Sequence, residues 1–294
     1  MGFKAAGMTL RIGGMFAGYS GLEMGVAQVL DASPAWFAEI DEAPARILQH
    51  HYPHVPNLGD VTRVDWGSVP RIDILTAGYP CQPFSQAGHR KGTNDERHLW
   101  PYVFDAIKYL RPRAAFFENV RGHLTLGLAE VLEDLASIGW DAQWACVRAS
   151  DVGAPHHRER LFILAYPNSE RPQEGGLARR PAPQITWDND LHDTLAGLNN
   201  AADIGHEMTL RWGDSSPAIL TWAMLTGHAP PPIVGDRQDY RAETTAEFVE
   251  WMMGLPEGWV TKVPGLTRNQ QLKALGNGVV PQAAATALTH LLTT

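Results

Sequence analysis

The chain has 294 residues, 44% of them apolar and 19% charged, and a formal net charge of −8 at pH 7. This length suffices for one large domain and a smaller second one, and the composition is ordinary for a folded soluble protein. No apolar run reaches the roughly 18 residues of a membrane span, and the first residues contain neither a long apolar block nor a cleavage site. We therefore expect no membrane segment and no secretory signal.

The cysteine content indicates the redox environment of the protein, and the net charge bears on the class of partner that it can bind. Cys81 and Cys146 are the only cysteines, too few for a disulfide framework, and without a signal they favour the reducing cytoplasm. Cys146 stands in the apolar stretch AQWACVRA and is expected to be a buried small hydrophobic residue. The acidic net charge argues mildly against a nucleic-acid partner. A polyanion would have to meet local basic patches, such as residues 261–273, which contain no acid.

The first half of the chain alternates short apolar runs with helix-like segments. Strands are predicted at residues 8–16, 34–41, 71–78, 113–120, 140–149 and 159–167, and helices at residues 22–31, 42–53, 102–112 and 126–139. This alternation is typical of a doubly wound α/β sheet with mostly parallel strands. We predict such a Rossmann-like domain over residues 1–166.

Beyond residue 166 the periodic pattern is lost. Residues 167–184 are rich in Pro, Gly and charge, as in a loop or linker, and Trp and Pro are scattered up to about residue 245. We predict a second, smaller domain over residues 167–245. A helix then begins with Thr244 as its N-cap and stops at Gly254, and a Gly/Asn turn and an Ala-rich helix follow. Residues 246–294 are expected to return to the first domain.

Glycines and acids follow the first two predicted strands. The turn FAGYSG occupies residues 16–21, and Glu39 and Asp41 end the second strand. Ligands of open parallel sheets bind beyond the carboxyl ends of the strands, and glycines permit their close approach. The turn is not GxGxxG, so an ordinary tight strand–helix turn explains it equally well. The acids can hold a ribose or begin a helix in solvent.

Cys81 is the most informative single residue. It follows a buried strand in GYPCQPFSQAG, and prolines on both sides restrict the backbone around it. The residues around it are polar and typical of turns, which disfavours a buried structural cysteine. A thiol with a lowered pKa, or with a partner that accepts its proton, becomes a nucleophilic thiolate. We therefore regard Cys81 as a candidate for chemistry.

Three further stretches are ambiguous when taken singly. Glu118, directly after an apolar strand, is a candidate for a raised pKa and proton donation, although Asn119 beside it can cap a helix instead. Arg158 and Arg160 in HHRER share one face of an extended chain and can hold a phosphate or carbonyl oxygen, or face solvent. Asn277, in the turn GNGVVP, can reach a ligand or belong to an ordinary loop.

Together these stretches resemble the cytosine-C5 DNA methyltransferases of bacteria and phages. The resemblance covers nearly the whole chain, in the order FAGYSG, the acids after the second strand, GD at 59–60, GYPCQPFSQAG, ENV, HHRERLFILA, EFVEWMMGLP and GNGVVP. The Pro-Cys-Gln, Glu-Asn-Val and Arg-x-Arg runs at these positions are jointly very specific. The resemblance implies the class I S-adenosylmethionine-dependent methyltransferase fold, with target recognition at residues 167–245.

The resemblance also implies a reaction, the transfer of a methyl group from S-adenosylmethionine to C5 of cytosine in a specific duplex DNA sequence. Cys81 would add to C6 of the ring, and Glu118 would hydrogen-bond N3 and the exocyclic amine. Arg160 would hold O2, and Arg158 would support the same pocket. The base would be flipped out of the duplex at a cost of a few kcal/mol. The biological role would be restriction–modification or protection of a phage genome.

Two further sets of residues follow from the resemblance. DNA contacts would come from a mobile loop that contains Gln82, Ser85, Arg90 and Lys91. The S-adenosylmethionine pocket would comprise Phe16, Ala17, Gly18, Gly21, Glu39, Ile40, Asp60, Val61, Pro80, Leu99, Trp100 and Asn277. The partner would be double-stranded DNA, with neither a metal nor a membrane. We expect a monomer, because the duplex supplies the second binding surface and no oligomerisation motif is visible.

The chain departs from the family pattern beside the glycine turn. The family usually has an acidic residue just before Phe-Ala-Gly, where this chain has Gly14 and Met15, and Ser20 replaces a usual glycine. Both departures bear on affinity for the cofactor and not on its identity. The variable region is short and acidic, so we expect the basic residues at 158–180 and 262–273 to flank the DNA cleft.

Three alternatives compete with this interpretation. Relatives that methylate transfer RNA carry a late Cys-Phe-Thr tripeptide, whereas Val-Arg follows Cys146 here. A cysteine hydrolase needs a general-base histidine, for which His156 and His157 are candidates, but it gives no role to Glu-Asn-Val. A catalytically inactive DNA-binding module would have no need for the intact Cys81, Glu118 and Arg160.

Overall fold

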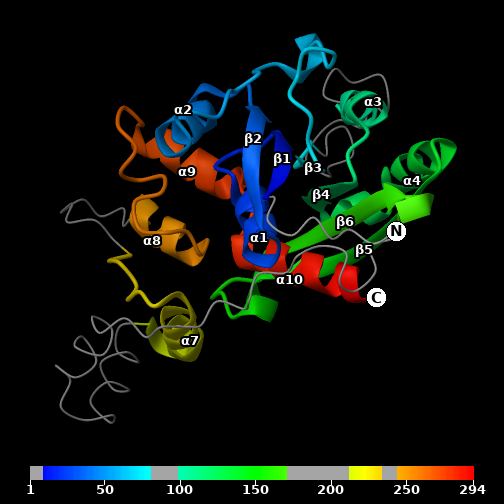
Figure 1. Cartoon of the computed structure of the whole chain (residues 1–294). Coiled ribbons are helices and arrows are strands. Elements are labelled where there is room, and N and C mark those ends of the chain that lie inside the picture. Colours follow the sequence, from blue (N-terminus) through cyan, green and yellow to red (C-terminus); the bar gives the residue numbers. More distant parts are fainter. Residues whose placement is uncertain (1–8, 81–98, 171–211, 234–243) are drawn as a thin grey trace.

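The structure is a computed structural model and describes residues 9–80, 99–170, 212–233 and 244–294 (Figure 1). The described strands are β1 Leu10–Met15, β2 Ala32–Ala38, β3 Ile74–Ala77, β4 Ala114–Val120, β5 Trp140–Arg148 and β6 Glu159–Pro167. The described α-helices are α1 Gly21–Val29, α2 Glu42–His51, α3 Trp100–Leu110, α4 Leu128–Ser137, α7 Ser216–Thr226, α8 Ala246–Met252, α9 Arg268–Asn277 and α10 Pro281–Thr293.

The strands form one mixed sheet with the order β2-β1-β3-β4-β6-β5. Strands β1 to β4 pair in parallel, whereas β6 is antiparallel to both β4 and β5. Residues 149–158 join β5 to β6, and a segment this short cannot hold the crossover helix that parallel neighbours require. The predicted doubly wound, mostly parallel sheet is therefore confirmed, with β6 as its antiparallel strand.

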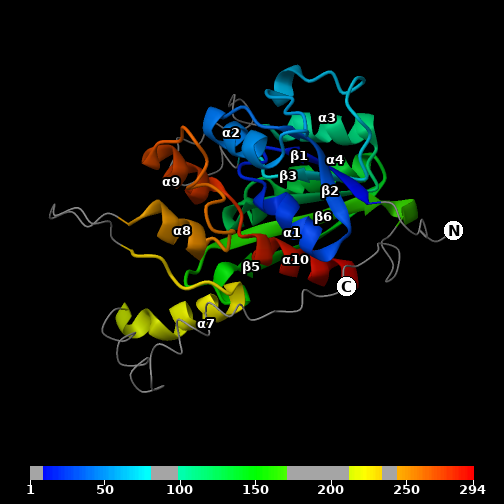
Figure 2. The ribbon, with the colours of Figure 1, turned by 60° about the vertical axis from the view of Figure 1, so that its left-hand side comes forward.

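Helices cover both faces of the sheet, which gives three layers (Figure 2). On one face, α1 and α10 pack against apolar side chains of the sheet, including Phe116 and Phe162. On the other face, α3 and α4 pack against a second set, including Phe117 and Ile163. Neighbouring residues of β4 thus face opposite layers, as the two-residue period of a strand requires.

The strand order reverses at β1, since β2 lies on one side of it and β3 on the other. In open α/β sheets the ligand crevice opens at this switch point, outside the carboxyl ends of the strands. The turn FAGYSG leaves β1 there, and the segment that leads to Cys81 leaves β3 beside it. The fold therefore brings the two most notable sequence stretches to one edge.

The C-terminal part differs from prediction in two details. Helix α9 begins after Thr267, which forms a capping box with Gln270, and it ends at Asn277. Asn277 is therefore the last residue of a helix and not part of a turn. The N-cap of α8 is Thr245 and not Thr244, because the Thr245 hydroxyl accepts a hydrogen bond from Phe248 N.

Helix α7 was not predicted, because its sequence SPAILTWAMLT is apolar on all sides and shows no helical period. It packs beneath α8, and the indole N–H of Trp222 donates to Trp251 O at 2.8 Å. The domain bounds at 167–245 stay a prediction. Of the helices in the described ranges, none is long and apolar enough to cross a membrane. Cys146 was predicted to be buried, but it is only half-buried, and it packs against the apolar cluster that includes residues of α3 and α4.

Candidate active site

The glycine turn after β1 has a left-handed backbone at three positions and is hydrogen-bonded to the segment that ends β2. Phe16, Gly18 and Ser20 have φ angles of 53°, 57° and 72°, in the left-handed region. Phe16 N donates to Ala38 O, and Gly18 N donates to Glu39 Oε2, both at 2.9 Å. A methyl group at Gly18 would have no atom within 4 Å. The turn is thus fixed to the end of β2 and open above Gly18.

Glu39 and Ile40 directly follow β2, and their side chains have opposite environments. The second oxygen of Glu39 accepts from Asp41 N at 2.8 Å, and burial raises the pKa of this carboxyl despite its hydrogen bonds. The side chain of Ile40 is 70% exposed, although apolar side chains of this size are mostly buried. An open apolar side chain beside a partly buried carboxylate suits a flat heteroaromatic ring joined to a sugar.

The other predicted cofactor residues occupy varied positions. Asp60 caps a short 3-10 helix, and its carboxylate accepts from Thr62 N at 2.9 Å and Thr62 Oγ1 at 2.8 Å, which lowers its pKa. Val61 is buried beside it. Leu99 caps α3, and Trp100 lies in the core, where its indole N–H donates to Asp134 at 2.7 Å. Trp100 therefore packs in the core behind the candidate site and does not lie at its solvent-exposed edge.

Gly78 lies where the cofactor turn meets the predicted chemistry. A methyl group at Gly78 would stand 3.5 Å from Phe16 O and 3.6 Å from Glu118 Oε2. Tyr79 is buried after it, and Pro80 is exposed. The next residue is Cys81, which lies outside the described residues, as do Gln82, Ser85, Arg90 and Lys91. Phe16, Gly78 and Glu118 thus converge immediately before the cysteine.

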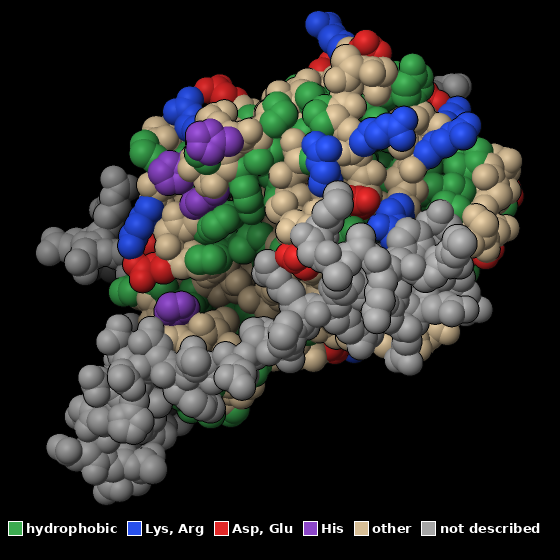
Figure 3. All heavy atoms as spheres, in the orientation of Figure 1, with side chains coloured by type: hydrophobic (Ala, Val, Ile, Leu, Met, Phe, Trp, Pro, Cys, Tyr) green, Lys and Arg blue, Asp and Glu red, His purple; other side chains and the backbone are tan. Residues whose placement is uncertain are grey.

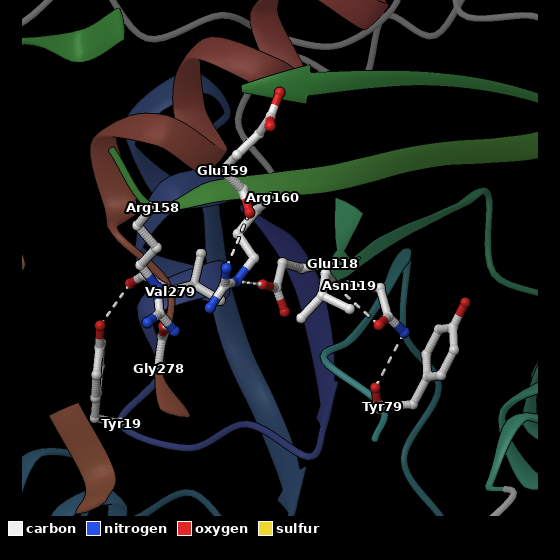
Figure 4. A network of polar contacts seen from close by, with 10 residues as sticks. Tyr19, Tyr79, Glu118, Asn119, Arg158, Glu159, Arg160, Gly278 and Val279 are labelled. Carbon is white, nitrogen blue, oxygen red and sulfur yellow. Dashed lines mark hydrogen bonds and ion pairs between the residues drawn. The ribbon is translucent and has the colours of Figure 1, made fainter. Parts of the chain in front are cut away.

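Glu118 and Arg160 form a buried ion pair at this edge (Figure 4). Arg160 Nε lies 2.8 Å from Glu118 Oε1, and the two side chains are only 20% and 10% exposed. Burial raises the pKa of Glu118, an effect opposed by the charges of Arg160 and Arg158. Glu118 can therefore retain a proton above the ordinary carboxyl range and donate it to a bound group.

Asn119 connects β4 to the segment before Cys81. Its side-chain amide donates to Tyr79 O at 3.2 Å, and its own oxygen accepts from Val120 N at 2.9 Å. The short helix that follows has Val120 as its N-cap, so Asn119 does not act as a helix cap. It holds the backbone immediately before the cysteine.

Arg158 is directed away from Glu118 toward the C-terminal segment. Its Nη2 donates to Gly278 O at 2.7 Å, next to Val279 O, which accepts from Tyr19 Oη at 2.7 Å (Figure 4). The side chain of Asn277, one residue earlier, is exposed. Any support of Arg158 for a base pocket thus passes through residues 278 and 279.

Glu23 explains the departure at Gly14 and was not found from the sequence. Glu23 is 2% exposed and accepts from Thr76 Oγ1 at 2.7 Å. A methyl group at Gly14 would lie 2.7 Å from Glu23 Oε1, closer than a Cβ tolerates. Burial raises the pKa of Glu23, opposed by hydrogen bonding to Thr76 and Ser20. The carboxyl group below the turn is thus supplied by α1, and Gly14 leaves space for it. An acid in the otherwise apolar start of α1 was the signal.

Glu250 is a second buried acid that the sequence did not reveal. Its carboxylate accepts from Gly258 N at 2.7 Å, from Thr261 N and Thr261 Oγ1 at 2.9 Å, and from Val260 N at 2.5 Å. The loop that it folds carries Trp259, which stacks on His51 with ring centroids 3.6 Å apart. The indole N–H of Trp259 donates to Tyr19 O at 2.9 Å.

The predicted basic flank at residues 262–273 is largely engaged within the protein. Lys262 pairs with Glu257, and Lys273 pairs with Asp41, both at 2.5 Å. In Figure 3 the region of α9 lies on the left, whereas Lys and Arg side chains gather at the upper right, over α3 and its surroundings. A role of residues 262–273 at a DNA cleft stays a prediction.

Of the two histidines that a cysteine hydrolase could use, His156 has another partner. His156 Nε2 lies 3.0 Å from Met252 O, which links the start of β6 to the end of α8. Burial lowers the pKa of this imidazole. Among the described residues, no group of three or more His, Cys, Asp or Glu side chains is arranged to hold a metal ion.

The fold is that of known methyltransferases. Over 97% of this chain and 98% of the other, it superposes on the Entamoeba histolytica methyltransferase EhMeth with a TM-score of 0.64 and 18% identity. The Schizosaccharomyces pombe Dnmt2 methyltransferase matches with a TM-score of 0.63 and 16% identity, over 96% of this chain and 98% of that chain. At such identities the likeness establishes the fold alone.

Sequence relatives establish the family. The type II methyltransferase M1.ScrFI of Lactococcus lactis subsp. cremoris is 32% identical over 93% of this chain and 76% of its own length. M.Bsp6I of a Bacillus species is 31% identical over 92% of this chain and 95% of its own length. With three type II methyltransferases of Neisseria, the match spans about half of the relative's length or less, from 39% to 52%.

The profile of a family described as C-5 cytosine-specific DNA methylase matches residues 10–209, which is more than half of the chain. The match includes the glycine turn, Glu118 and the arginine pair of β6. This chain therefore belongs to the C-5 cytosine-specific DNA methylase family.

Proposed function

We propose that this protein transfers a methyl group from S-adenosylmethionine to C5 of a flipped-out cytosine in duplex DNA, through a covalent bond between Cys81 Sγ and C6. The observation that carries the proposal is the buried Glu118–Arg160 pair, 2.8 Å apart, which adjoins Gly78 and the cofactor turn. Family membership makes cytosine the expected base.

The roles of the protein side chains follow from charge development on the ring. Addition of the Cys81 thiolate to C6 pushes electrons toward C5 and N3, so C5 becomes nucleophilic. A protonated Glu118 donates to N3 as this charge develops, and its pKa is already raised by burial. Arg160 orients Glu118 and has further N–H donors for O2 of the base. Once C5 carries the methyl group, its proton passes to a solvent base and the Sγ–C6 bond breaks, which releases the thiolate, and N3 returns its proton to Glu118.

The residues at the switch point fit S-adenosylmethionine, which when bound supplies an electrophilic methyl group. The open space above Gly18 would accommodate the methionine part beside the amides of the turn. Glu39 would bind the ribose, the exposed Ile40 would cover the adenine, and the charged Asp60 would accept from its amine. We propose that the other members of this pocket are Ala17, Gly21, Val61, Pro80, Leu99 and Asn277, and that Trp100 supports the pocket from the core.

We assign DNA contacts to Gln82, Ser85, Arg90 and Lys91, and target recognition to residues 167–245. The cytosine must leave the duplex, because the buried side chain of Glu118 cannot contact a base that is still stacked between its neighbours. A monomer suffices for this arrangement. Relatives described as type II methyltransferases favour a role in restriction–modification or in protection of a phage genome.

Bisulfite sequencing of plasmid DNA tests the proposal directly. The wild-type protein and Cys81→Ser are expressed in a host that lacks cytosine methylation. We expect protected cytosines within one short sequence context in the wild type and none with Cys81→Ser. The same protection in both would remove Cys81 from the mechanism. No protection by wild type that binds S-adenosylhomocysteine would exclude DNA cytosine methylation and turn attention to RNA.

A further inference from the structure

We infer that Tyr19 is a positioning residue. It couples the cofactor turn to Arg158 and Arg160, at the start of β6, through the backbone of Gly278 and Val279. The inference rests on the proposed function, because the two ends of this bridge are the proposed cofactor and cytosine pockets. Neither family membership nor the catalytic roles above assign Tyr19 a part.

The side chain of Tyr19 is buried deep below the turn. It is 0% exposed, and its hydroxyl donates to Val279 O at 2.7 Å across 260 residues of sequence. Tyr19 lies in the left-handed turn between Gly18 and Ser20, and its hydroxyl points toward the segment of Gly278 and Val279 (Figure 4). The residue therefore joins the floor of the proposed cofactor site to the C-terminal segment.

The contact is tight on both sides and admits only glycine. A methyl group at Gly278 would lie 1.8 Å from the Tyr19 ring, and one at Gly21 would lie 2.2 Å from Val279 O. Real Cβ atoms do not approach so closely, so neither segment can shift without moving the other. Trp259 adds a third constraint, because its indole N–H donates to Tyr19 O at 2.9 Å.

Arg158 completes the bridge from the chemical side. It donates to Gly278 O at 2.7 Å, one residue from the carbonyl that Tyr19 holds. Arg158 immediately precedes β6 and lies two residues from Arg160, whose Nε is 2.8 Å from Glu118 Oε1. A movement of residues 278 and 279 is therefore transmitted to the site where Glu118 and Arg160 would hold the base.

Asn277 places the same segment in the proposed cofactor pocket. It immediately precedes Gly278 and ends α9 with an exposed side chain. A ligand that contacts both the turn and Asn277 would order the segment that Tyr19 and Arg158 share. By linkage, such a ligand and the DNA must then alter each other's affinity by the same factor.

The test measures this factor in Tyr19→Phe, which deletes one oxygen and keeps the ring. The dissociation constant of S-adenosylhomocysteine is measured by calorimetry with and without a duplex that carries the site found by bisulfite sequencing. We expect a ratio of about 5-fold or more in the wild type and a ratio near one in Tyr19→Phe. Tyr166→Phe is the matched control, because Tyr166 is also buried and its hydroxyl accepts a hydrogen bond from Gln143 Nε2, and this variant should keep the wild-type ratio.

A wild-type ratio in Tyr19→Phe would overturn the inference, even if the variant is less stable, because a purely structural role lowers stability without changing the ratio. A ratio of one in the wild type would overturn it as well. Should Tyr19→Phe fail to fold, Arg158→Lys breaks the bridge from its other end and should lose the same coupling. If bisulfite sequencing finds no methylated cytosine, the proposed function fails, and the ratio measured with a mixed-sequence duplex still tests the bridge.

Discussion

Glu118 and Glu250 are both buried carboxylates, but their partners differ. Glu250 accepts three backbone N–H groups and one hydroxyl, so both of its oxygens are occupied by the protein. Glu118 is paired with Arg160 through Oε1, while Oε2 lies toward Gly78. The comparison teaches that a carboxylate saturated by backbone amides fixes a loop, whereas one with an oxygen left toward an open edge is available for chemistry.

The largest expected effect is on the rate of Glu118→Gln. An amide cannot deliver a proton to N3, so we expect turnover to fall by about 10²- to 10⁴-fold, more than the loss of the buried charge pair with Arg160 alone would lower it. Single-turnover methylation of a hemimethylated or unmethylated duplex measures the rate. A near-normal rate would reduce Glu118 to a structural partner of Arg160 and abolish its contrast with Glu250.

The pH dependence of the rate should sharpen the same contrast. The raised pKa of Glu118 means that its proton is lost only above the ordinary carboxyl range, so the rate should decline as pH rises through that pKa. Thiolate formation at Cys81 acts in the opposite direction, which produces a bell-shaped profile. In Glu118→Gln the decline assigned to Glu118 should be absent. An unchanged profile in this variant would assign the decline to another group.

Glu250→Gln should affect stability more than chemistry. The amide nitrogen would face backbone N–H groups that have no alternative acceptor, at a cost of about 1–3 kcal/mol for each group left unpaired. We expect the melting temperature to fall by several degrees, with a much smaller loss of rate than in Glu118→Gln. Thermal unfolding and single-turnover rates measured on one preparation provide the check. A rate loss as large as that of Glu118→Gln would contradict the distinction.

Glu23→Gln should give the smallest effect, a change in how steeply the free energy of unfolding depends on pH. Because burial raises the pKa of Glu23, the native state keeps a proton that the unfolded state releases above about pH 4.3. The contribution of Glu23 to wild-type stability is therefore fully present at low pH and is lost as pH rises through the folded-state pKa. The Gln variant lacks this term, so urea unfolding between pH 4 and 8 should show a flatter dependence. A parallel dependence in both proteins would mean that Glu23 is charged in the native state.

Much of the parallel sheet could be predicted from the sequence, and Glu118 and Arg160 could be singled out as candidates, but the ion pair between them could not. The strands β1, β3, β4 and β6 are short apolar runs, and Glu118 and Arg160 stand at their ends, where position alone suggests function. The orientation of β6 was less accessible, because it depends on the length of a connection and not on the strand itself. Helix α7 escaped detection because it is apolar all round.

The residues that the sequence did not reveal are those whose partners lie far away. Nothing near Tyr19 indicates that its hydroxyl meets Val279, and nothing near Glu250 indicates that it binds the backbone of its own following loop. Gly14 was interpreted as a loss, whereas the fold supplies a carboxyl group from Glu23 at the same place. Local patterns report burial and periodicity, but they do not report which distant groups will meet.

The contact between Tyr19 and Val279 has a consequence for biosynthesis. A chain that emerges from the ribosome in order presents Tyr19, Glu118 and Arg160 well before residues 278 and 279. Until then the hydroxyl of Tyr19 and the guanidinium of Arg158 lack their native acceptors, and α1 lacks the apolar cover of α10. Long-range pairings of this kind close late and slow folding. A nascent methylase would therefore acquire its complete cofactor floor only after residues 278 and 279 have left the ribosome.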